Sequence, residues 1–258
     1  MAIPKISIIT IVFNDVKHIE GTILSVLEQT NDNIEYIIID GSSSDGTLDV
    51  IKKYADKLSY WISEKDDGIY DAMNKGLRAA TGDFIWFLNS GDQIHEKTAV
   101  DKFIQKIDEE TDVIYGETVL IDEDGNILGM RRKKAPENLT WKSFFTGMMV
   151  CHQSVLVRRS VAPEYNEKYR FSADFEWVLV SLKKARKVVN SHQILSRYLE
   201  EGATTQNHKA SLKERFEIMK RYFGFIPTVL IHVWLAFTSF FFSLQNKGDY
   251  RPFDSSKD

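Results

Sequence analysis

Apolar residues in the first hundred positions fall into short unbroken runs, separated by segments of helical spacing. Ile6 to Phe13 and Ile34 to Ile39 are rich in β-branched residues and nearly free of polar ones, which is typical of strands buried on both faces of a parallel sheet. Further strands are expected at Leu58 to Ser63 and Asp83 to Leu88, and helices at Val16 to Gln29, Thr47 to Ala55 and Ile69 to about Ala80. Strands that alternate with helices predict a doubly wound α/β sheet.

The pattern after Asp108 is less regular. Short strands are expected at Val113 to Tyr115, Thr118 to Ile121, Ile127 to Arg131 and Ser154 to Val157, helices at Leu139 to Phe145 and Asp174 to Lys184, and an extended segment at Lys187 to Leu199. A helix from His208 to Phe223 is expected to pack one apolar face on the body, using Leu212, Phe216, Met219 and Phe223.

The segment from Ile226 to Leu244 has no charged side chain but includes Pro227 and His232. Its length is close to that needed to cross a bilayer. A spanning helix, a helix lying in the membrane interface and a core or dimer helix all remain open.

Composition narrows the class of protein. The 258 residues are enough for one large domain, alone or with a small appendage. A formal net charge of -4 gives no general attraction to nucleic-acid phosphates, and the basic run from Arg131 to Lys134 is either a solvated loop or a binding patch. The single Cys151 excludes an internal disulfide and a cysteine metal site. Since Met1 to Lys5 has no signal-peptide pattern, we expect a cytoplasmic catalytic part.

Polar residues cluster where the expected strands end. The four loops hold Asn14 and Asp15, Asp40 to Asp45, Glu64 to Gly68, and Asn89 to Asp92. In doubly wound sheets ligands bind outside the carboxyl ends of the strands. The sequence therefore predicts a binding edge rich in carboxylates.

Two of these acidic residues, and Asp174 in the second half of the chain, have a specific expected chemistry. Asp40 could accept hydrogen bonds from a nucleobase imide, shared with Asn14, although a capped turn explains the same residues. Asp92 could hold a divalent cation that bridges diphosphate oxygens, or could be an ordinary turn residue. Asp174 lies among aromatic residues, where burial would raise its pKa toward that of a general base, or it could simply cap a helix.

Six segments taken together resemble the family 2 glycosyltransferases of bacterial polysaccharide assembly. They are SIITIVFN, IIIDGSSSDGT, SEKDDGIYDAMNKG, TGDFIWFLNSGD, HQS and SADFEW, in this order, within Lys5 to Thr205. The resemblance implies an inverting enzyme with the Rossmann-like, A-type nucleotide-sugar sheet flanked by helices, followed by a C-terminal helical extension.

The resemblance also implies roles for individual residues. Asp174 would be the catalytic base, and Asp92 the metal ligand for Mn²⁺ or Mg²⁺, with His152 close to the metal or acceptor. The donor, expected to be a UDP-sugar, would contact the following residues: Thr10, Asn14, Asp40, Asp71, Asn74, Lys75, Asn89, Ser90, Gly91 and Arg197. The Gly202, Ala203 and Thr204 loop would lie near the diphosphate.

Two positions depart from the family pattern. Asn89 to Asp92 supplies one carboxylate where many relatives have an acidic triplet, and Gly41 replaces an acid often found beside Asp40. A nucleotidyltransferase is an alternative, but the loop after the first strand lacks glycine. A non-catalytic nucleotide-sugar or glycan-binding module is another alternative.

The resemblance divides the chain into expected parts. Residues 1–205 would form the catalytic domain, with 1–110 as the nucleotide-sugar-binding half and 111–205 as the acceptor-binding half. Residues 206–246 would form C-terminal helices that are membrane-associated or dimerising, and residues 247–258 a flexible tail. The expected partners are a nucleotide-sugar donor and a glycan or lipid-linked acceptor, without nucleic acid, and with peripheral contact to the inner face of the membrane or a homo-oligomer as further possibilities.

Overall fold

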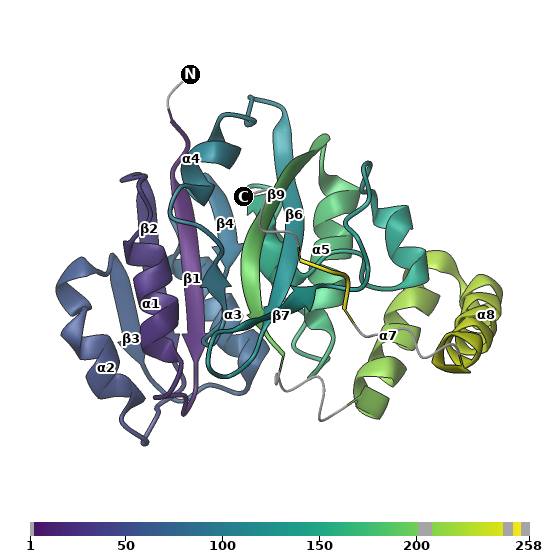
Figure 1. Ribbon diagram of the computed structural model, residues 1–258, viewed down its shortest axis with the longest axis horizontal. Coiled ribbons are helices and arrows are strands. Elements are labelled where there is room, and N and C mark those ends of the chain that lie inside the picture. The colour runs from purple at the N-terminus through teal and green to yellow at the C-terminus, as the bar shows by residue number, and fades with distance from the viewer. Residues whose placement is uncertain (1–2, 201–207, 245–249, 254–258) are drawn as a thin grey trace.

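The computed structural model describes residues 3–200, 208–244 and 250–253 (Figure 1). Its strands are β1 Ile6–Val12, β2 Ile34–Asp40, β3 Tyr60–Ser63, β4 Phe84–Phe87, β5 Gln93–Ile94, β6 Thr111–Ile121, β7 Ile127–Met130, β8 Val155–Arg158 and β9 Lys187–Leu199. Its α-helices are α1 Ile19–Leu27, α2 Thr47–Lys53, α3 Ile69–Ala79, α4 Ala99–Ile104, α5 Ala173–Lys184, α7 His208–Phe223 and α8 Phe225–Leu244. Short 3-10 turns cover Ala55–Lys57, Trp141–Thr146 and His152–Ser154.

One sheet runs through the molecule in the order β3-β2-β1-β4-β8-β6-β9-β5, with β7 paired to β6. The four strands of the first half are parallel neighbours, β1 pairing with β2 and β4, and β2 with β3. β8 is antiparallel to both β4 and β6, and β9 is parallel to β6. The expected α/β sheet is confirmed, and the carboxyl ends of β1, β2, β3 and β4 share one edge.

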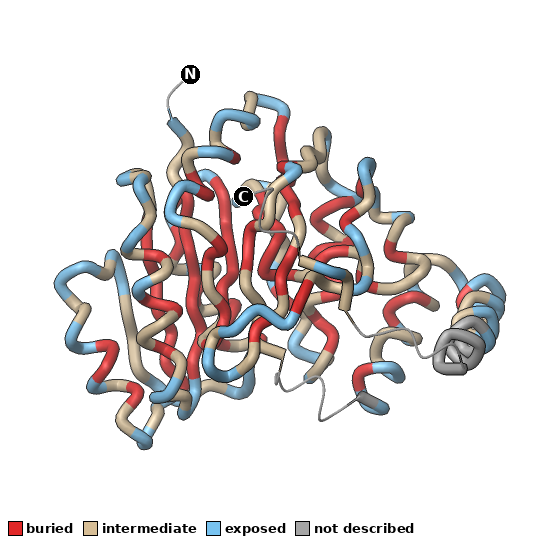
Figure 2. The backbone as a smooth tube through the Cα atoms, viewed as in Figure 1, coloured by how far each residue is buried: buried red, intermediate tan, exposed pale blue. Residues whose placement is uncertain are grey.

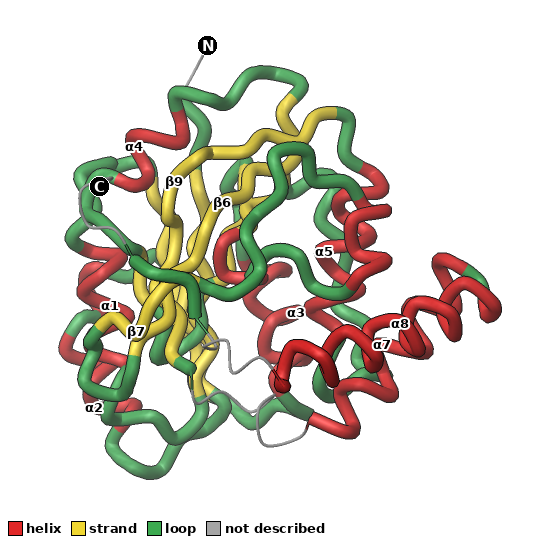
Figure 3. Tube along the Cα trace, turned by 45° about the vertical axis from the view of Figure 1, so that its right-hand side comes forward, coloured by secondary structure: helices red, strands yellow, loops and turns green. Residues whose placement is uncertain are grey.

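Side chains on the two faces of the sheet form two separate cores. Ile9 and Ile37 pack with α3 and α5 on one face, whereas Ile8 and Ile38 pack with α1, α2 and α4 on the other. Successive side chains of a strand point to opposite faces, so a strand that is apolar throughout supports both cores. Figure 2 shows the buried residues running through the central strands, and Figure 3 shows helices on both sides of them.

Several boundaries differ from the sequence expectation. The two short strands expected at Val113 to Tyr115 and Thr118 to Ile121 are one strand, β6, because Gly116 lets β9 approach: a Cβ there would lie 2.5 Å from the Gln193 carbonyl oxygen. The short strand β5 and the helix α4 were not expected. Within α7, Met219 is buried but Leu212 is exposed, so the inner face of that helix is rotated from the expected one.

Of the expected flexible tail the structure describes residues 250–253, and these contact the sheet. Arg251 exchanges backbone hydrogen bonds of 2.9 and 3.0 Å with Met130 of β7. Its guanidinium pairs with Glu117 at 2.8 Å. These contacts fix this part of the tail to the sheet, while residues 247–249 and 254–258 lie outside the described residues.

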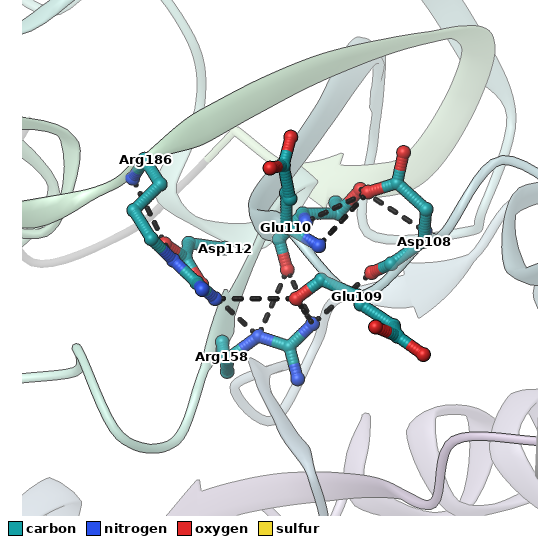
Figure 4. A network of polar contacts seen from close by, with 7 residues as sticks. Asp108, Glu109, Glu110, Asp112, Arg158 and Arg186 are labelled. Atoms are coloured by element: carbon teal, nitrogen blue, oxygen red, sulfur yellow. Dashed lines mark hydrogen bonds and ion pairs between the residues drawn. The ribbon is translucent and has the colours of Figure 1, made fainter.

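An ion-pair network centred on the buried Asp112 joins β6, β8 and the start of β9 (Figure 4). The Asp112 carboxylate is fully buried and lies 3.0 Å from Arg158 Nε and 2.9 Å from the Arg186 guanidinium. Arg186 and the other hydrogen-bonding partners hold the pKa of Asp112 below its usual range. The network ties β6, β8 and the start of β9 to one another.

Candidate active site

The loops after β1 and β2 are tied into one surface. Asn14 has a positive φ of 50°, a conformation that Asn tolerates. Its side-chain oxygen accepts a hydrogen bond from Ser44 N at 2.9 Å, and its own N–H donates to Ser43 Oγ. The buried Asp40 carboxylate accepts hydrogen bonds from Ser43 N and Ser63 Oγ. The structure therefore brings Asn14 and Asp40 to the same edge, as the sequence predicts.

The unusual Gly41 leaves room for another carboxylate. A Cβ at Gly41 would lie 2.8 Å from Asp66 Oδ2. Burial, together with the charges of Asp71 and Asp40, raises the pKa of Asp66. Asp66 thus occupies the space beside Asp40 that a side chain at position 41 would fill. Sequence reasoning missed this residue as an individual, although it placed the loop from Glu64 to Gly68 at the binding edge.

Three of the expected donor contacts, Asp71, Asn74 and Lys75, lie on α3 but have different surroundings. Lys75 Nζ lies 3.0 Å from Glu64 and 3.4 Å from Asp71, which keeps these charges at the loop surface. Asn74 instead is buried, with its amide nitrogen donating to Tyr165 O and Glu167 and its oxygen accepting from Tyr165 N at 2.7 Å. Because its polar atoms are all used, Asn74 holds the segment near Tyr165 against α3.

The turn after β4 has an unpartnered oxygen. Asp92 N donates to Asn89 O at 3.0 Å, and Ser90 Oγ donates to Asp15 at 2.7 Å. Gly91 has a φ of 93° and packs under Leu199, which a Cβ would approach to 2.8 Å. Asn89 Oδ1 is buried and has no hydrogen-bond partner, an arrangement that leaves it available to a bound group.

Asp92 is buried, and no Lys or Arg side chain among the described residues forms an ion pair with its carboxylate. Its Oδ2 accepts from Gln153 Nε2 at 2.9 Å, and its Oδ1 accepts from Leu199 N at 3.1 Å. Burial raises the pKa of Asp92 to about 7, and the charge of Asp15 adds to the rise. Within the HQS segment singled out from the sequence, Gln153 is therefore the residue that holds the Asp92 carboxylate.

The expected metal ligands fit unequally. Among the described residues no group of three or more His, Cys, Asp or Glu side chains could hold a metal ion. Asp92 and the unpartnered Asn89 oxygen are hard oxygen donors of the type that Mg²⁺ and Mn²⁺ prefer. His152 is buried between the Phe87 and Trp177 rings, its Nε2 lies 2.5 Å from Tyr165 Oη, and burial lowers its pKa to about 3. His152 is thus part of an aromatic wall.

Asp174 lies in the first turn of α5, beside this wall. Tyr70 Oη donates to Asp174 Oδ1 at 3.3 Å. Tyr70 stacks on Tyr165, which stacks on Trp177. Burial raises the pKa of Asp174, opposed by the charge of Arg215 and by hydrogen bonds. A carboxylate with a raised pKa at the end of an aromatic wall has the properties of a general base.

Tyr198 of β9 is influenced by the charges of both Asp92 and Asp174. Burial and the charges of Cys151, Asp92 and Asp174 raise the pKa of the Tyr198 hydroxyl. The Arg197 guanidinium instead donates to His95 O at 3.1 Å, and its Nε is buried without a partner. Since neighbouring side chains of a strand face opposite ways, Tyr198 rather than Arg197 faces Asp92 and Asp174.

The remaining donor candidates have simpler placements. Thr10 is buried within β1, and its hydroxyl lies 3.1 Å from Tyr36 Oη. The expected loop of Gly202, Ala203 and Thr204 lies outside the described residues. A role for Thr10 in donor binding stays a prediction.

Comparison with known proteins gives the geometry a context. The family model described as Glycosyl transferase family 2 matches residues 7–165. An uncharacterized glycosyltransferase of Mycobacterium tuberculosis is 31% identical over 183 residues, which cover 68% of each chain. A PGL/p-HBAD biosynthesis glycosyltransferase of Mycobacterium bovis is 28% identical over 215 residues, 78% of this chain and 79% of the relative. A Bacillus subtilis relative named for teichuronic acid biosynthesis is 27% identical over 238 residues, 86% of this chain and 94% of the relative.

Solved structures show the same fold. Staphylococcus aureus TarS, residues 1–349 in complex with UDP-GlcNAc, superposes with a TM-score of 0.69 at 21% identity, over 84% of this chain and 64% of that chain. A mannosyltransferase from Pyrobaculum calidifontis, in complex with GDP-Man and Mn²⁺, superposes with a TM-score of 0.62 at 14% identity over the same shares. The chain thus spans somewhat less than two thirds of each solved chain.

Proposed function

Because the chain belongs to glycosyltransferase family 2, we propose that it transfers a sugar from a UDP-sugar to a hydroxyl of a glycan or lipid-linked glycan, in cell-surface polysaccharide assembly. The observation that carries the proposal is a set of four carboxylates: Asp40 at the end of β2 and Asp66 in the loop after β3, and Asp92 in the turn after β4 and Asp174 in the first turn of α5. Relatives named for PGL/p-HBAD and teichuronic acid biosynthesis support the pathway class.

Recognition of uracil is proposed for Asn14 and Asp40. An ionised carboxylate can accept the imide N–H of uracil, and the loop bonds from Ser43 and Ser63 keep Asp40 fixed for this. Support for a uridine donor comes from the UDP-GlcNAc complex of TarS, and the GDP-Man complex of the mannosyltransferase keeps a second nucleotide as the alternative. Asp66 is proposed to take the place of the acid that Gly41 lacks.

Asp174 is proposed as the base in a single inverting displacement. It removes the proton of an acceptor hydroxyl while that oxygen attacks the anomeric carbon, and the bond from this carbon to the diphosphate oxygen breaks on the opposite face. The proton ends on Asp174, and the nucleoside diphosphate leaves with the bonding electrons. The buried position of Asp174 supports the role, because it raises the carboxylate's affinity for the proton.

A divalent metal is proposed at Asp92, with Asn89 as a second oxygen donor. Bound there, Mn²⁺ or Mg²⁺ would neutralise the charge that develops on the leaving diphosphate. The Gln153 and Leu199 hydrogen bonds orient the Asp92 carboxylate. His152 is left out of the proposed ligand set because its ring is enclosed by aromatic side chains.

The family membership leaves the nucleotidyltransferase alternative without support, and the non-catalytic module remains as the rival. Calorimetric titration of UDP and a panel of UDP-sugars, with and without Mn²⁺, tests the proposal. We expect UDP to bind and Mn²⁺ to strengthen its binding. Absence of binding by any uridine nucleotide would overturn the uridine assignment, and the matching titration with GDP-sugars then tests the alternative donor.

The C-terminal helix is proposed to rest on the inner face of the membrane, where a lipid-linked acceptor would be found. Among the described residues, no helix meets the length and hydropathy needed for crossing a bilayer. The exposed large apolar residues of α8 nevertheless include Ile226, Leu230, Val233, Trp234 and Phe237, which share one side of the helix at this spacing. Such a stripe fits an interfacial helix.

Vesicle flotation of the full chain tests this placement. Leu230→Glu with Trp234→Glu should release the protein from anionic vesicles, whereas Lys213→Glu on α7 serves as a charge-matched surface control. A double variant that still floats, or that instead changes from dimer to monomer in sedimentation, would contradict the membrane role. The assignments of 1–110 to the donor, 111–205 to the acceptor and 206–246 to the membrane are part of the same proposal.

A further inference from the structure

A group of cationic side chains lies next to the candidate base. Arg131 donates to the carbonyl oxygens of Met148 at 2.9 Å and Met149 at 3.0 Å. Lys133 Nζ donates to Thr146 O at 2.6 Å. Both residues belong to the basic run that the sequence left as a solvated loop or a binding patch. Their ends are held by the backbone of one short segment, residues 146–149.

Arg215 of α7 completes this cluster. The start of α7 is fixed to the start of α5, since Glu214 accepts from Arg170 N and Phe171 N, and Ser172 and Ser211 share a hydrogen bond. The charge of Arg215 acts on both Asp174 and Lys133. Its Nε is buried without a hydrogen-bond partner. A buried guanidinium nitrogen of this kind calls for an acceptor that the described residues do not supply.

The cluster has an excess of positive charge. Burial, with the charges of Arg131, Arg215 and Arg132, lowers the pKa of Lys133 to about 8. In the part of the chain that the structure describes, no carboxylate lies within ion-pair distance of Arg131, Lys133 or Arg215. Holding like charges together in a half-buried place is unfavourable unless an anion compensates them.

Such an anion could belong to the nucleotide-sugar donor or to the acceptor, and the position of the cluster favours the acceptor. The edge assigned to the nucleoside is built from the loops after β1 and β2, with Asn14, Asp40 and Asp66. Lys133 and Arg215 come from the second half of the chain, and the charge of Arg215 acts on both Asp174 and Lys133. An anion bound there would be next to the hydroxyl that the base deprotonates, and therefore on the acceptor.

We propose that Arg131, Lys133 and Arg215 form a subsite for an oxyanion of the acceptor, a phosphate or a carboxylate, adjacent to the hydroxyl that Asp174 activates. This inference rests on the proposed function. Guanidinium and ammonium groups bind such oxyanions through charge-assisted hydrogen bonds. The subsite would give the enzyme a preference for anionic acceptors over neutral ones.

Binding of small oxyanions to the full chain saturated with UDP tests the subsite. The probes are inorganic phosphate, observed by the broadening of its ³¹P resonance, and methyl glucuronide against methyl glucoside, observed by ligand NMR. We expect both oxyanions to bind in the presence of UDP and the neutral glucoside to bind at least roughly tenfold more weakly. Lys133→Met and Arg215→Met should each weaken oxyanion binding by a similar factor and leave UDP binding within about twofold.

Lys134→Met is the matched control, since it removes the same charge from the exposed neighbouring position and should leave oxyanion binding unchanged. Lys133→Arg keeps the positive charge that Lys133→Met removes, so it should bind oxyanions as the wild type does. A role of Lys133 in packing alone would not require this recovery. If UDP displaces phosphate and the variants weaken UDP, the cluster holds the donor diphosphate and the inference is overturned. It is also overturned if the UDP-bound wild type binds no oxyanion, whereas failure of UDP itself to bind would instead refute the proposed function.

Discussion

Asp92→Asn should stabilise the protein at alkaline pH. In the folded chain the pKa of Asp92 is raised from 3.8 to about 7. The folded state therefore holds this proton more tightly than the unfolded state, and stability falls as the pH rises from about 4 to about 7. A shift of about 3 pKa units corresponds to an upper limit of about 4 kcal/mol for burying the ionised carboxylate. Asparagine removes that cost at pH 8.5.

The expected net gain is smaller than this limit. Asparagine keeps an oxygen for Leu199 N, but its amide faces Gln153, whose own amide must turn over to accept from it. Allowing for the weaker hydrogen bonds, we expect a gain of about 2 kcal/mol at pH 8.5, or roughly 4–8 °C in melting temperature for a chain of this size. At pH 5, about one unit above the unfolded pKa, only about 1.6 kcal/mol of this cost applies, and the weaker hydrogen bonds of asparagine offset it, so the difference should be close to zero.

Thermal unfolding of both proteins at pH 5 and pH 8.5, in EDTA, measures this effect. Asp112→Asn is the contrasting control, because its carboxylate is paired with Arg158 and with the largely exposed Arg186, and its loss should destabilise the protein by about 2 kcal/mol at pH 8.5. A destabilised Asp92→Asn at pH 8.5, or an equal change at both pH values, would refute the reasoning. It would show that Asp92 is not a strained anion in the metal-free protein.

Two further substitutions test the site. Tyr70→Phe removes the hydroxyl that lowers the pKa of Asp174 but keeps the ring stacked on Tyr165, so the acidic limb of the kcat/KM profile should move to higher pH; an unmoved limb would separate Tyr70 from the base. Gly41→Asp should weaken UDP binding roughly tenfold or more, because its side chain meets Asp66. Adding Asp66→Gly to that variant should restore binding in the same titration, and a double variant as weak as the single one would contradict the exchange of carboxylates.

The general fold could be predicted because its strands are buried on both faces. Such strands appear as continuous apolar runs, and Ile6 to Phe13 and Ile34 to Ile39 differ from β1 and β2 by one residue each at the carboxyl end. The polar loops follow from the same pattern, since parallel strands end at one edge. The single long β6 could not be foreseen, because Gly116 has its effect through the approach of β9, a contact distant in sequence.

Individual roles within the site were harder to predict, because they depend on the direction of each side chain. Arg197 and Tyr198 are adjacent in β9, and only the pairing of that strand decides which of them faces Asp92. Asn74 has an amide that could bind a ligand, but the hydrogen bonds of this amide are taken up by the Tyr165 backbone. Asp66 gains its place through the absence of a side chain at Gly41. These relations arise between segments that are far apart along the chain.

The most direct test of the central claim is transfer by Asp174→Asn. The measurement is UDP release from UDP-sugars by the full chain, with a lipid-glycan extract as acceptor, beside calorimetric binding of UDP to the same preparations. We predict that the variant binds UDP as the wild type does and loses transfer by a factor on the order of 10²–10⁴. Transfer by the variant at the wild-type rate, with UDP binding intact, would contradict the assignment of Asp174 as the base.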